Sequence, residues 1–368
     1  MHYSRFIEME ISVKVLLLGE YSGFYYSLKR GLQELGVEVY LKANGDDFKN
    51  IPGADKLLYK DAGSNKISRG YNRIIMPELN KGDMQGYDVV QMVHDILYSP
   101  YINSHMVNYL KKKNGKVFTN ITGNHYSLYQ SWLDKKLEYY TYDDNPDKYK
   151  IFLKETDSDR RYVESSKYVD SVVDGIIPTT YEYAIGVRDY KNVKKTIPLP
   201  MNCNGIDYEE NKINGKLFFY HGLLRPLDKG GKYIAEALKI IKDKYPNDVD
   251  ICVADTLPLN EYLEVLKKTN VLVDQCKEHC WGMNTCYGMA MGKVVMGGAS
   301  DKSLEEYGLT ESPIVHITPN VDQIVSQLEY VIENRNNITE WGYKSRKFVE
   351  EFHDSKRIAQ MYLDTWKE

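Results

Sequence analysis

The sequence predicts an α/β protein with two Rossmann-like, doubly wound domains that face a cleft. Three observations support this fold class. The chain opens as strand, loop, helix and strand, its second half again alternates strands with helices, and a cluster of proline, asparagine and glycine residues at 198–205 separates the halves. A length of 368 residues suffices for two such domains. Because ligands of these sheets bind beyond the carboxyl ends of the strands, we expect the functional site in the cleft.

Composition narrows the class of protein further. Hydrophobic and charged fractions of 42% and 27% are those of an ordinary globular chain, and a net charge of −4 argues against a general nucleic-acid binder. The five cysteines form no recognisable disulfide framework, no run of about 18 apolar residues suggests a membrane span, and the first residues lack a signal-peptide core. We therefore expect a reduced, cytoplasmic protein. Cys276, His279 and Cys280 lack the spacing of a zinc site, so we expect neither a metal nor a cofactor.

The first half begins with an apolar run at 13–19 that ends in glycine, as a buried parallel strand does. A tight loop at 20–24 leads into a helix at 25–35, which Gly36 closes. Two glycines near the loop, Gly19 and Gly23, do not make a dinucleotide-binding fingerprint. The other elements predicted here are strands at 37–41, 87–93, 116–122 and 169–177, a helix at 104–113, and an irregular or helical insertion at 126–162.

The second half alternates more regularly. Its predicted strands are 216–221, 250–254, 271–275 and 293–296, and its predicted helices are 230–243, 261–268, 284–291 and 321–333. An amphipathic helix at 343–366 follows. We assign 1–200 to an N-terminal domain and 205–342 to a C-terminal domain, and we expect the helix at 343–368 to pack back on the N-terminal domain.

Two cations carry the first chemical motif. Arg225 and Lys229 stand between a predicted strand and a predicted helix. Fixed positive charge in that place can stabilise a departing diphosphate. A loop of solvated charges is the alternative interpretation.

A glycine turn carries the second motif. Trp281-Gly282 precedes the helix at 284–291, and the free backbone N–H groups at a helix N-terminus attract phosphate and sugar oxygens. An ordinary turn between strand and helix is the alternative. The residues that would offer backbone donors are Met283, Asn284 and Thr285.

In their order along the chain, these motifs resemble the retaining glycosyltransferases of the GT-B fold, the family that includes sucrose synthases and bacterial polysaccharide and lipid mannosyltransferases. The order of elements agrees over nearly the whole chain. The resemblance implies that Arg225 and Lys229 hold the diphosphate of a nucleotide sugar and that the N-terminal domain binds the acceptor. It also implies that the donor sugar and phosphates contact the glycine turn, namely Gly282, Met283, Asn284 and Thr285.

One departure from the family pattern concerns its two glutamates, eight residues apart, which contact the donor sugar and the ribose. His279 takes the first position and Tyr287 the second. His279 or the adjacent Glu278 can still hydrogen-bond a sugar hydroxyl, whereas Tyr287 offers the ribose one hydroxyl in place of a bidentate carboxylate. The change indicates either an altered donor or an inactive relative.

The resemblance also implies a polar residue, often histidine, near the reacting sugar carbon. His125 follows the strand at 116–122, and His94, at the end of the neighbouring strand, is the rival candidate. Since the donor phosphate is thought to deprotonate the acceptor in retaining transfer, His125 would orient the reactants. A histidine in a surface loop is the alternative. Gly23, in the loop after the first strand, would permit close approach at the cleft mouth.

We therefore expect a metal-independent, retaining hexosyltransferase that uses a UDP- or GDP-linked sugar and a saccharide or lipid-linked acceptor, in surface polysaccharide or glycoconjugate biosynthesis. The alternatives are an inactive GT-B-like protein that binds glycans or partners, and a UDP-sugar 2-epimerase. The epimerase needs a tight cluster of acids and histidines, which the sequence does not locate. The predicted helix at 104–113 ends in three lysines, Lys111, Lys112 and Lys113. They are interpreted either as a solvated face or as a peripheral contact with the inner face of a membrane.

Tyrosine is over-represented, with 32 residues against 9 Phe and 4 Trp, so its placement needs an explanation. Aromatic plates beside a sugar cleft can stack on pyranose rings, and a composition bias is the alternative. Six tyrosines crowd the stretch after His125: Tyr126, Tyr129, Tyr139, Tyr140, Tyr142 and Tyr149.

Overall fold

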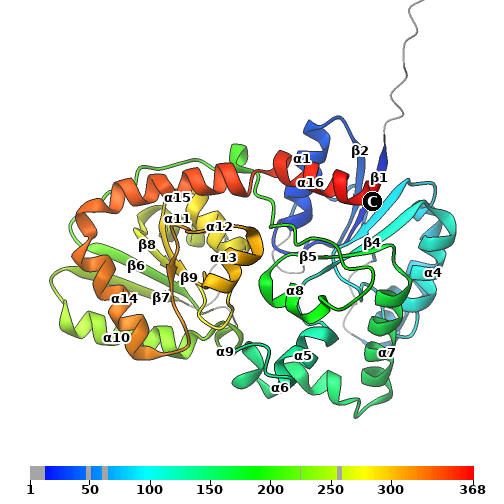
Figure 1. The fold of residues 1–368 in the computed structure, drawn as a ribbon, viewed down its shortest axis with the longest axis horizontal. Helices are drawn as coiled ribbons and strands as arrows, with labels where there is room; N and C mark the ends of the chain where they lie inside the picture. Colours follow the sequence, from blue (N-terminus) through cyan, green and yellow to red (C-terminus); the bar gives the residue numbers. More distant parts are fainter. Residues whose placement is uncertain (1–12, 47–50, 60–64, 224, 255–258) are drawn as a thin grey trace, which may run out of the picture.

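The computed structural model describes residues 13–46, 51–59, 65–223, 225–254 and 259–368, and every structural statement below concerns these residues. Two lobes lie side by side, each built on a five-stranded sheet with helices on both faces (Figure 1). Neighbouring strands pair in parallel throughout both sheets. The predicted fold class, two Rossmann-like α/β units, is confirmed.

The first lobe holds a sheet with the strand order β2-β1-β3-β4-β5. The strands are β1 (Lys14–Leu18), β2 (Glu38–Lys42), β3 (Val89–Met92), β4 (Lys116–Ile121) and β5 (Gly175–Pro178). The helices are α1 (Phe24–Glu34), α2 (Lys66–Gly70), α3 (Met76–Leu79), α4 (Asn103–Lys113), α5 (Tyr126–Leu133), α6 (Pro146–Tyr149), α7 (Asp157–Val172) and α8 (Tyr181–Val187). A π-helical turn, η2 (Tyr71–Ile75), joins α2 to α3, and 3₁₀ turns occur at η3 (Lys81–Met84), η4 (Thr141–Asp143) and η5 (Lys150–Leu153).

The second lobe holds a sheet with the order β10-β9-β8-β6-β7. The strands are β6 (Leu217–Gly222), β7 (Val249–Ala254), β8 (Val271–Val273), β9 (Val294–Gly297) and β10 (Val315–His316). The helices are α9 (Pro226–Lys229), α10 (Gly231–Lys244), α11 (Leu259–Lys268), α12 (Met283–Ala290), α13 (Asp301–Tyr307), α14 (Val321–Glu333) and α15 (Ile338–Phe352). A 3₁₀ turn, η6 (Cys203–Gly205), follows the linker between the lobes, and η7 (Arg335–Asn337) precedes α15.

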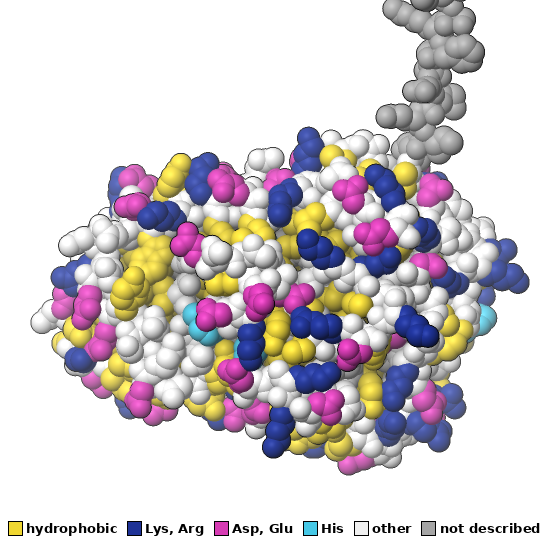
Figure 2. Space-filling view, viewed as in Figure 1, with side chains coloured by type: hydrophobic (Ala, Val, Ile, Leu, Met, Phe, Trp, Pro, Cys, Tyr) yellow, Lys and Arg dark blue, Asp and Glu magenta, His cyan; other side chains and the backbone are white. Residues whose placement is uncertain are grey.

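Alternation along β1 shows why both faces of the first sheet are covered. Val15 and Leu17 point into an apolar cluster with α1, whereas Leu16 and Leu18 point into a second cluster with α4. All four side chains are at most 1% exposed, as expected for a strand that is buried on both faces. On the face in Figure 2, basic and acidic side chains are interspersed, which agrees with the small net charge.

The helix predicted at 343–366 is two helices in the structure. α15 ends at Phe352, and α16 (Ser355–Lys367) begins after Asp354, whose side chain accepts a hydrogen bond from the Arg357 backbone. α15 packs on α12 in the second lobe, and α16 crosses to pack on α1 in the first lobe (Figure 1). The break arises because each helix has its own apolar face for its own lobe.

Buried polar groups fix where α16 docks. The Tyr362 hydroxyl accepts a hydrogen bond from Asn120 of β4 at 2.7 Å, and the Trp366 indole donates to Gln91 of β3 at 2.9 Å. Both aromatic side chains are almost fully buried. Because an unpaired buried polar group is costly, these two bonds set the register of α16 on the sheet.

Other predicted elements also need correction. Residues 169–172, predicted as the start of a strand, form the last turn of α7, because Val163, Ser166, Val169 and Asp170 bury one face at helical spacing. The strand β5, which pairs with β4 on this side, runs from Gly175 to Pro178. The helices α8 and α13 and the strand β10 are not among the predicted elements, because each is short and without a clear apolar period.

The tyrosine-rich insertion is built on its own aromatic cluster. Tyr129 stacks on Phe152 with ring centroids 5.0 Å apart, and Tyr140 and Tyr142 are at most 2% exposed. The expectation that these tyrosines line a sugar surface is therefore wrong for Tyr140 and Tyr142. Their rings replace an aliphatic core in this short insertion.

Gly31 allows the close approach of α1 and α16. A methyl group built there would lie 2.0 Å from the backbone oxygen of Ser355. We expect Gly31→Ala to destabilise the protein by about 1–3 kcal/mol, since backbone must move to admit the methyl group. Urea unfolding of both variants checks this, with Gly70→Ala as the matched control, since no atom lies within 4 Å of that position. An equal free energy of unfolding for Gly31→Ala and the unaltered chain would contradict the packing described here.

Candidate functional site

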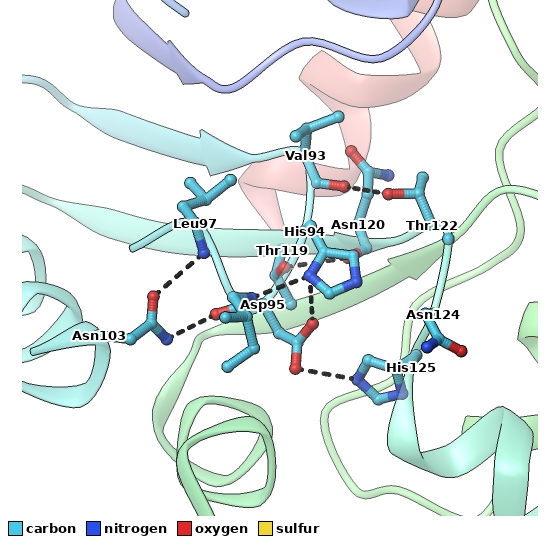
Figure 3. Close-up of polar contacts among 12 residues, drawn as sticks. Val93, His94, Asp95, Leu97, Asn103, Thr119, Asn120, Thr122, Asn124 and His125 are labelled. Carbon is cyan, nitrogen blue, oxygen red and sulfur yellow. Dashed lines mark hydrogen bonds and ion pairs between the residues drawn. The ribbon is translucent and has the colours of Figure 1, made fainter. Parts of the chain in front are cut away.

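The carboxyl ends of β3 and β4 bring two histidines and an aspartate together (Figure 3). His94 and Asp95 follow β3, and their Nδ1 and Oδ1 atoms lie 2.7 Å apart. His125 follows β4 and is the N-cap of α5, because its Nδ1 accepts a hydrogen bond from the Ser127 backbone at 3.1 Å. His125 is 1% exposed, so the interpretation of it as a surface-loop histidine is wrong.

Two carboxylates hold the other nitrogen of His125. Its Nε2 lies 3.4 Å from Oδ2 of Asp95 and 3.4 Å from Oδ2 of Asp170, which projects from α7. Burial lowers the pKa of His125, but the two carboxylates outweigh this and raise it to about 9. Nδ1 also contacts the Ser127 hydroxyl at 2.7 Å.

This cluster corrects one expectation directly. The sequence did not locate a tight group of acids and histidines, yet Asp95, His125 and Asp170 place one ligand atom each within 4.8 Å of one another. Among the described residues they are the group whose geometry could hold a metal ion. Asp95 could have been found beside His94, but Asp170 lies on a helix whose pattern gives no sign of it.

In the second lobe, Asp274 organises the predicted donor residues. This buried carboxylate accepts hydrogen bonds from Lys229 at 3.0 Å, Asn284 at 2.8 Å and Thr285 at 2.9 Å. Burial opposes ionisation, but Lys229 and the other donors hold the pKa of Asp274 below its ordinary value. The structure thus brings Lys229, Asn284 and Thr285 together, while Arg225 is exposed with a left-handed φ of 56°.

The glycine turn faces the loop of the first lobe. Gly282 is the N-cap of α12, and Met283 is its first residue. A methyl group built on Gly23 would lie 3.9 Å from the terminal carbon of Met283. The predicted cleft loop and donor turn are therefore neighbours across the lobes. Tyr287, half-buried on α12, packs in the apolar cluster of that face.

His279, at the first glutamate position of the GT-B pattern, faces the other lobe. Its ring stacks on Tyr139 of the insertion, with centroids 4.2 Å apart and planes at 13°. Burial lowers the pKa of His279 to about 4, so the ring is neutral. The adjacent Glu278 accepts a hydrogen bond from Gln275 at 2.6 Å. Tyr139 therefore covers one face of the His279 ring.

The same insertion places the carboxylate of Asp144 among three polar side chains of the second lobe. Asp144 contacts the buried ammonium of Lys277, pairs with Lys232 at 2.9 Å and accepts a hydrogen bond from Tyr233 at 3.1 Å. Lys277 is 1% exposed, and the sequence motifs did not single it out. Asp228 of α9 receives three further contacts from the insertion, from Thr141, Asn145 and Lys148.

The imidazole of His353 joins the linker, the loop at Trp281 and the crossing from α15 to α16. His353 Nδ1 lies 2.7 Å from the Leu199 carbonyl, so it carries the proton, and Nε2 accepts from the Trp281 indole at 2.8 Å. Burial lowers the pKa of His353 to about 4, which keeps Nε2 free to accept. The position of Trp281-Gly282 is thereby tied to the linker.

The lysine cluster lies away from these residues. α4 ends at Lys113 beside the start of β4, which is the amino edge of the first sheet. Lys111 pairs with Asp174 at 2.6 Å, whereas Lys112 and Lys113 are exposed. Among the described residues, no helix is both long enough and apolar enough to cross a bilayer.

Comparison with known proteins rests on structure, since no protein-family model and no curated protein sequence matches this chain. Sucrose-phosphate synthase from Thermosynechococcus elongatus superposes with a TM-score of 0.62 at 14% identity, over 96% of this chain and 98% of that one. Anabaena HepE, in complex with UDP and glucose, gives 0.59 at 10% identity, over 97% and 100%. A Listeria monocytogenes protein described as a UDP-N-acetylglucosamine 2-epimerase gives 0.53 at 11% identity, over 96% and 95%.

These neighbours define the class of fold. Full-length superposition on glycosyltransferases places this chain in the GT-B fold, as the sequence motifs predicted. At 10–14% identity the likeness establishes the fold and leaves the roles of individual residues as predictions.

The contact between Asp144 and Lys277 predicts that removing one charge destabilises the protein more than removing both. Asp144→Ala leaves a buried ammonium unpaired, and we expect a loss of about 3 kcal/mol in the free energy of unfolding. Asp144→Ala with Lys277→Met removes both charges and should restore most of that loss. Urea unfolding measures it. Glu138→Ala, which breaks the exposed pair with Lys302, is the control and should cost less than about 1 kcal/mol. A double variant less stable than Asp144→Ala alone would contradict this account.

Glu182 predicts a pH dependence of stability. Its carboxylate accepts a hydrogen bond from the Cys280 backbone across the lobes at 2.7 Å, and burial, with the nearby Glu278, raises its pKa from 4.5 to about 7. Because the folded protein holds this proton more tightly than the unfolded chain, stability is full below about pH 4.5 and falls as the pH rises through about 7.

Glu182→Gln should therefore match the unaltered chain at about pH 5 and exceed its free energy of unfolding by up to about 3 kcal/mol at about pH 8. Urea unfolding at both pH values measures the difference. Glu34→Gln, at an exposed position, is the control and should show no such gain. Parallel pH profiles for Glu182→Gln and the unaltered chain would show that Glu182 does not carry this proton.

Proposed function

We propose that this protein is a glycosyltransferase that moves a sugar from a nucleotide-diphosphate donor to a saccharide or lipid-linked acceptor with retention of configuration. The observation that carries the proposal is the placement of Lys229 and the α12 N-terminus around Asp274, at the carboxyl ends of β6 and β8, in a GT-B fold. HepE, which shares the fold, binds UDP and glucose. Surface polysaccharide or glycoconjugate biosynthesis is the role that we assign to such an activity.

The chemistry that we propose for the donor side follows from charge. Asp274 takes one of the three donors of the Lys229 ammonium and so aims it, leaving two donors for phosphate oxygens. Arg225, exposed nearby in the sequence, would add a second cation, and together they would stabilise the charge that develops on the diphosphate as the glycosidic bond breaks. With two cations in place, the proposed reaction uses no metal ion or cofactor.

On the acceptor side, we propose that His125 positions groups and does not remove a proton. The Ser127 backbone N–H occupies the lone pair of Nδ1, and Nε2 faces the carboxylates of Asp95 and Asp170, so neither ring nitrogen is free to act as a base. The donor phosphate then takes the acceptor proton. His94, whose Nδ1 accepts from the Ile96 backbone at 2.9 Å, stays the rival candidate.

A second candidate function is a UDP-sugar 2-epimerase. The cluster of Asp95, His125 and Asp170 is the observation that favours it, and the Listeria neighbour shares the fold. The replacement of the glutamate pair by His279 and Tyr287 keeps a third alternative open, an inactive protein that binds glycans.

One experiment separates the three. The purified chain is screened by thermal shift against UDP, GDP and their sugars, and the stabilising nucleotide sugar is then incubated with saccharide acceptors and analysed by NMR. Release of the nucleotide together with a new glycoside of the donor's anomeric configuration supports a retaining transferase. Conversion of the donor to its 2-epimer without net transfer supports the epimerase. No stabilisation by any nucleotide would refute both enzymes.

The two cations give a sharper prediction. Arg225→Gln with Lys229→Gln removes both charges while leaving Asp274 a hydrogen-bond donor, so the fold should persist. We expect kcat/KM to fall by at least about 100-fold, as when charge-stabilising donors are lost elsewhere. Lys239→Gln with Lys242→Gln, on the exposed face of α10, is the matched control. Turnover at the parental rate in the first variant would show that the donor site lies elsewhere.

A further inference from the structure

A continuous helical segment of the first lobe exposes an unusual row of apolar side chains. α2, η2 and α3 form fourteen consecutive residues from Lys66 to Leu79. Along them, Ile67 is 85% exposed, Tyr71 46%, Ile75 48% and Leu79 68%. Ile67 and Leu79 are the two most exposed large apolar side chains among the described residues, and Leu57, at 61%, is the third. We call Ile67, Tyr71, Ile75 and Leu79 the apolar row.

The spacing of the row keeps it on one side of the helix. Its members recur every four residues, and in an α-helix a row with this spacing turns slowly around the helix axis. The turn at Tyr71–Ile75 is π-helical, and its wider winding turns the chain less per residue, which counteracts that drift. The four side chains therefore remain close to a single line.

The segment has little packing of its own to hold it helical. None of the residues Tyr71–Ile75 is buried, and Pro77 is the buried residue of α3. Helices of this length are marginal in water unless an apolar face is covered. An exposed row of this kind is the signature of a surface that meets another apolar phase.

Charge on the same segment indicates which phase that is. The sequence of residues 66–79 contains three basic residues, Lys66, Arg69 and Arg73, and Arg73 is exposed. Glu78 is the single acid among residues 66–79, and it pairs with Lys81 at 2.6 Å. An apolar row with a positive balance matches an anionic lipid surface, where side chains enter the acyl boundary and cations meet headgroups.

The segment also lies at the functional edge of the sheet. Lys42, the last residue of β2, donates a hydrogen bond from its ammonium to the Asn80 carbonyl, directly after α3, at 3.3 Å. The carboxyl end of β2 shares its edge with the ends of β3 and β4, where His94 and His125 stand. A membrane bound to the apolar row would therefore lie at the cleft side of the lobe, opposite the edge with Lys113.

We propose that the segment from Lys66 to Leu79 docks this protein on an anionic membrane surface, with Ile67, Tyr71, Ile75 and Leu79 entering the interface. This docking does not depend on the proposed sugar transfer, and binding alone tests it.

The experiment is co-sedimentation of the full chain with vesicles of phosphatidylcholine, with and without phosphatidylglycerol. We expect binding to the anionic vesicles that weakens as salt is added. Ile67→Asp with Ile75→Asp should lower the bound fraction at least about tenfold, since two apolar contacts are lost. Leu133→Asp with Ile240→Asp carries the same charge change at positions 48% and 40% exposed, and should bind normally. Arg73→Glu should weaken binding to anionic vesicles.

A second readout guards against misfolding. Tyr71→Trp should show a blue-shifted emission when anionic vesicles are added, and the melting temperature of each variant should equal that of the unaltered chain. Equal binding to both vesicle types, or full binding by Ile67→Asp with Ile75→Asp, overturns the proposal. A dimer in light scattering that this variant converts to a monomer, without vesicle binding by the unaltered chain, also overturns it and assigns the row to a second copy of this chain.

Discussion

The relation between the two lobes depends on the buried imidazole of His353. One nitrogen donates to the linker at Leu199 and the other accepts from Trp281, so a single ring fixes the linker and the glycine turn at Gly282 at once. This works only while the ring is neutral, because a second proton would remove the acceptor that Trp281 needs. Burial secures that state by lowering the pKa of His353 to about 4. The glycine turn is thus placed by a residue near the far end of the described chain.

The tyrosine-rich insertion of the first lobe makes a second set of contacts between the lobes. Tyr139 covers His279, and Asp144 neutralises Lys277. The contacts of His353 are hydrogen bonds of a neutral ring, whereas the insertion makes charged and aromatic contacts with the second lobe. A ligand that contacts the covered face of His279 must therefore displace Tyr139, and one that binds the ammonium of Lys277 must displace Asp144. Its affinity will include the cost of breaking those contacts.

The sequence allowed the fold class and most strands to be predicted, because buried parallel strands are continuous apolar runs such as 13–19. The donor residues were predicted as a group because they are close in sequence. The same reasoning could not find Asp170, Asp144 or Lys277, since each meets its partner across a long chain separation and through ordinary helical or loop positions. The end of α15 was missed because two adjacent amphipathic helices give one continuous apolar period.

The crossing of α16 has a consequence for how the chain is made. Ile358, Ala359 and Tyr362 belong to the same apolar cluster as Val15 and Leu28, so the first lobe lacks one layer of its core until those residues leave the ribosome. At synthesis rates of about 5–20 residues per second, the nascent first lobe waits through the whole second lobe with that surface uncovered. The docking of the last helix is thus the step that completes the core of the first lobe.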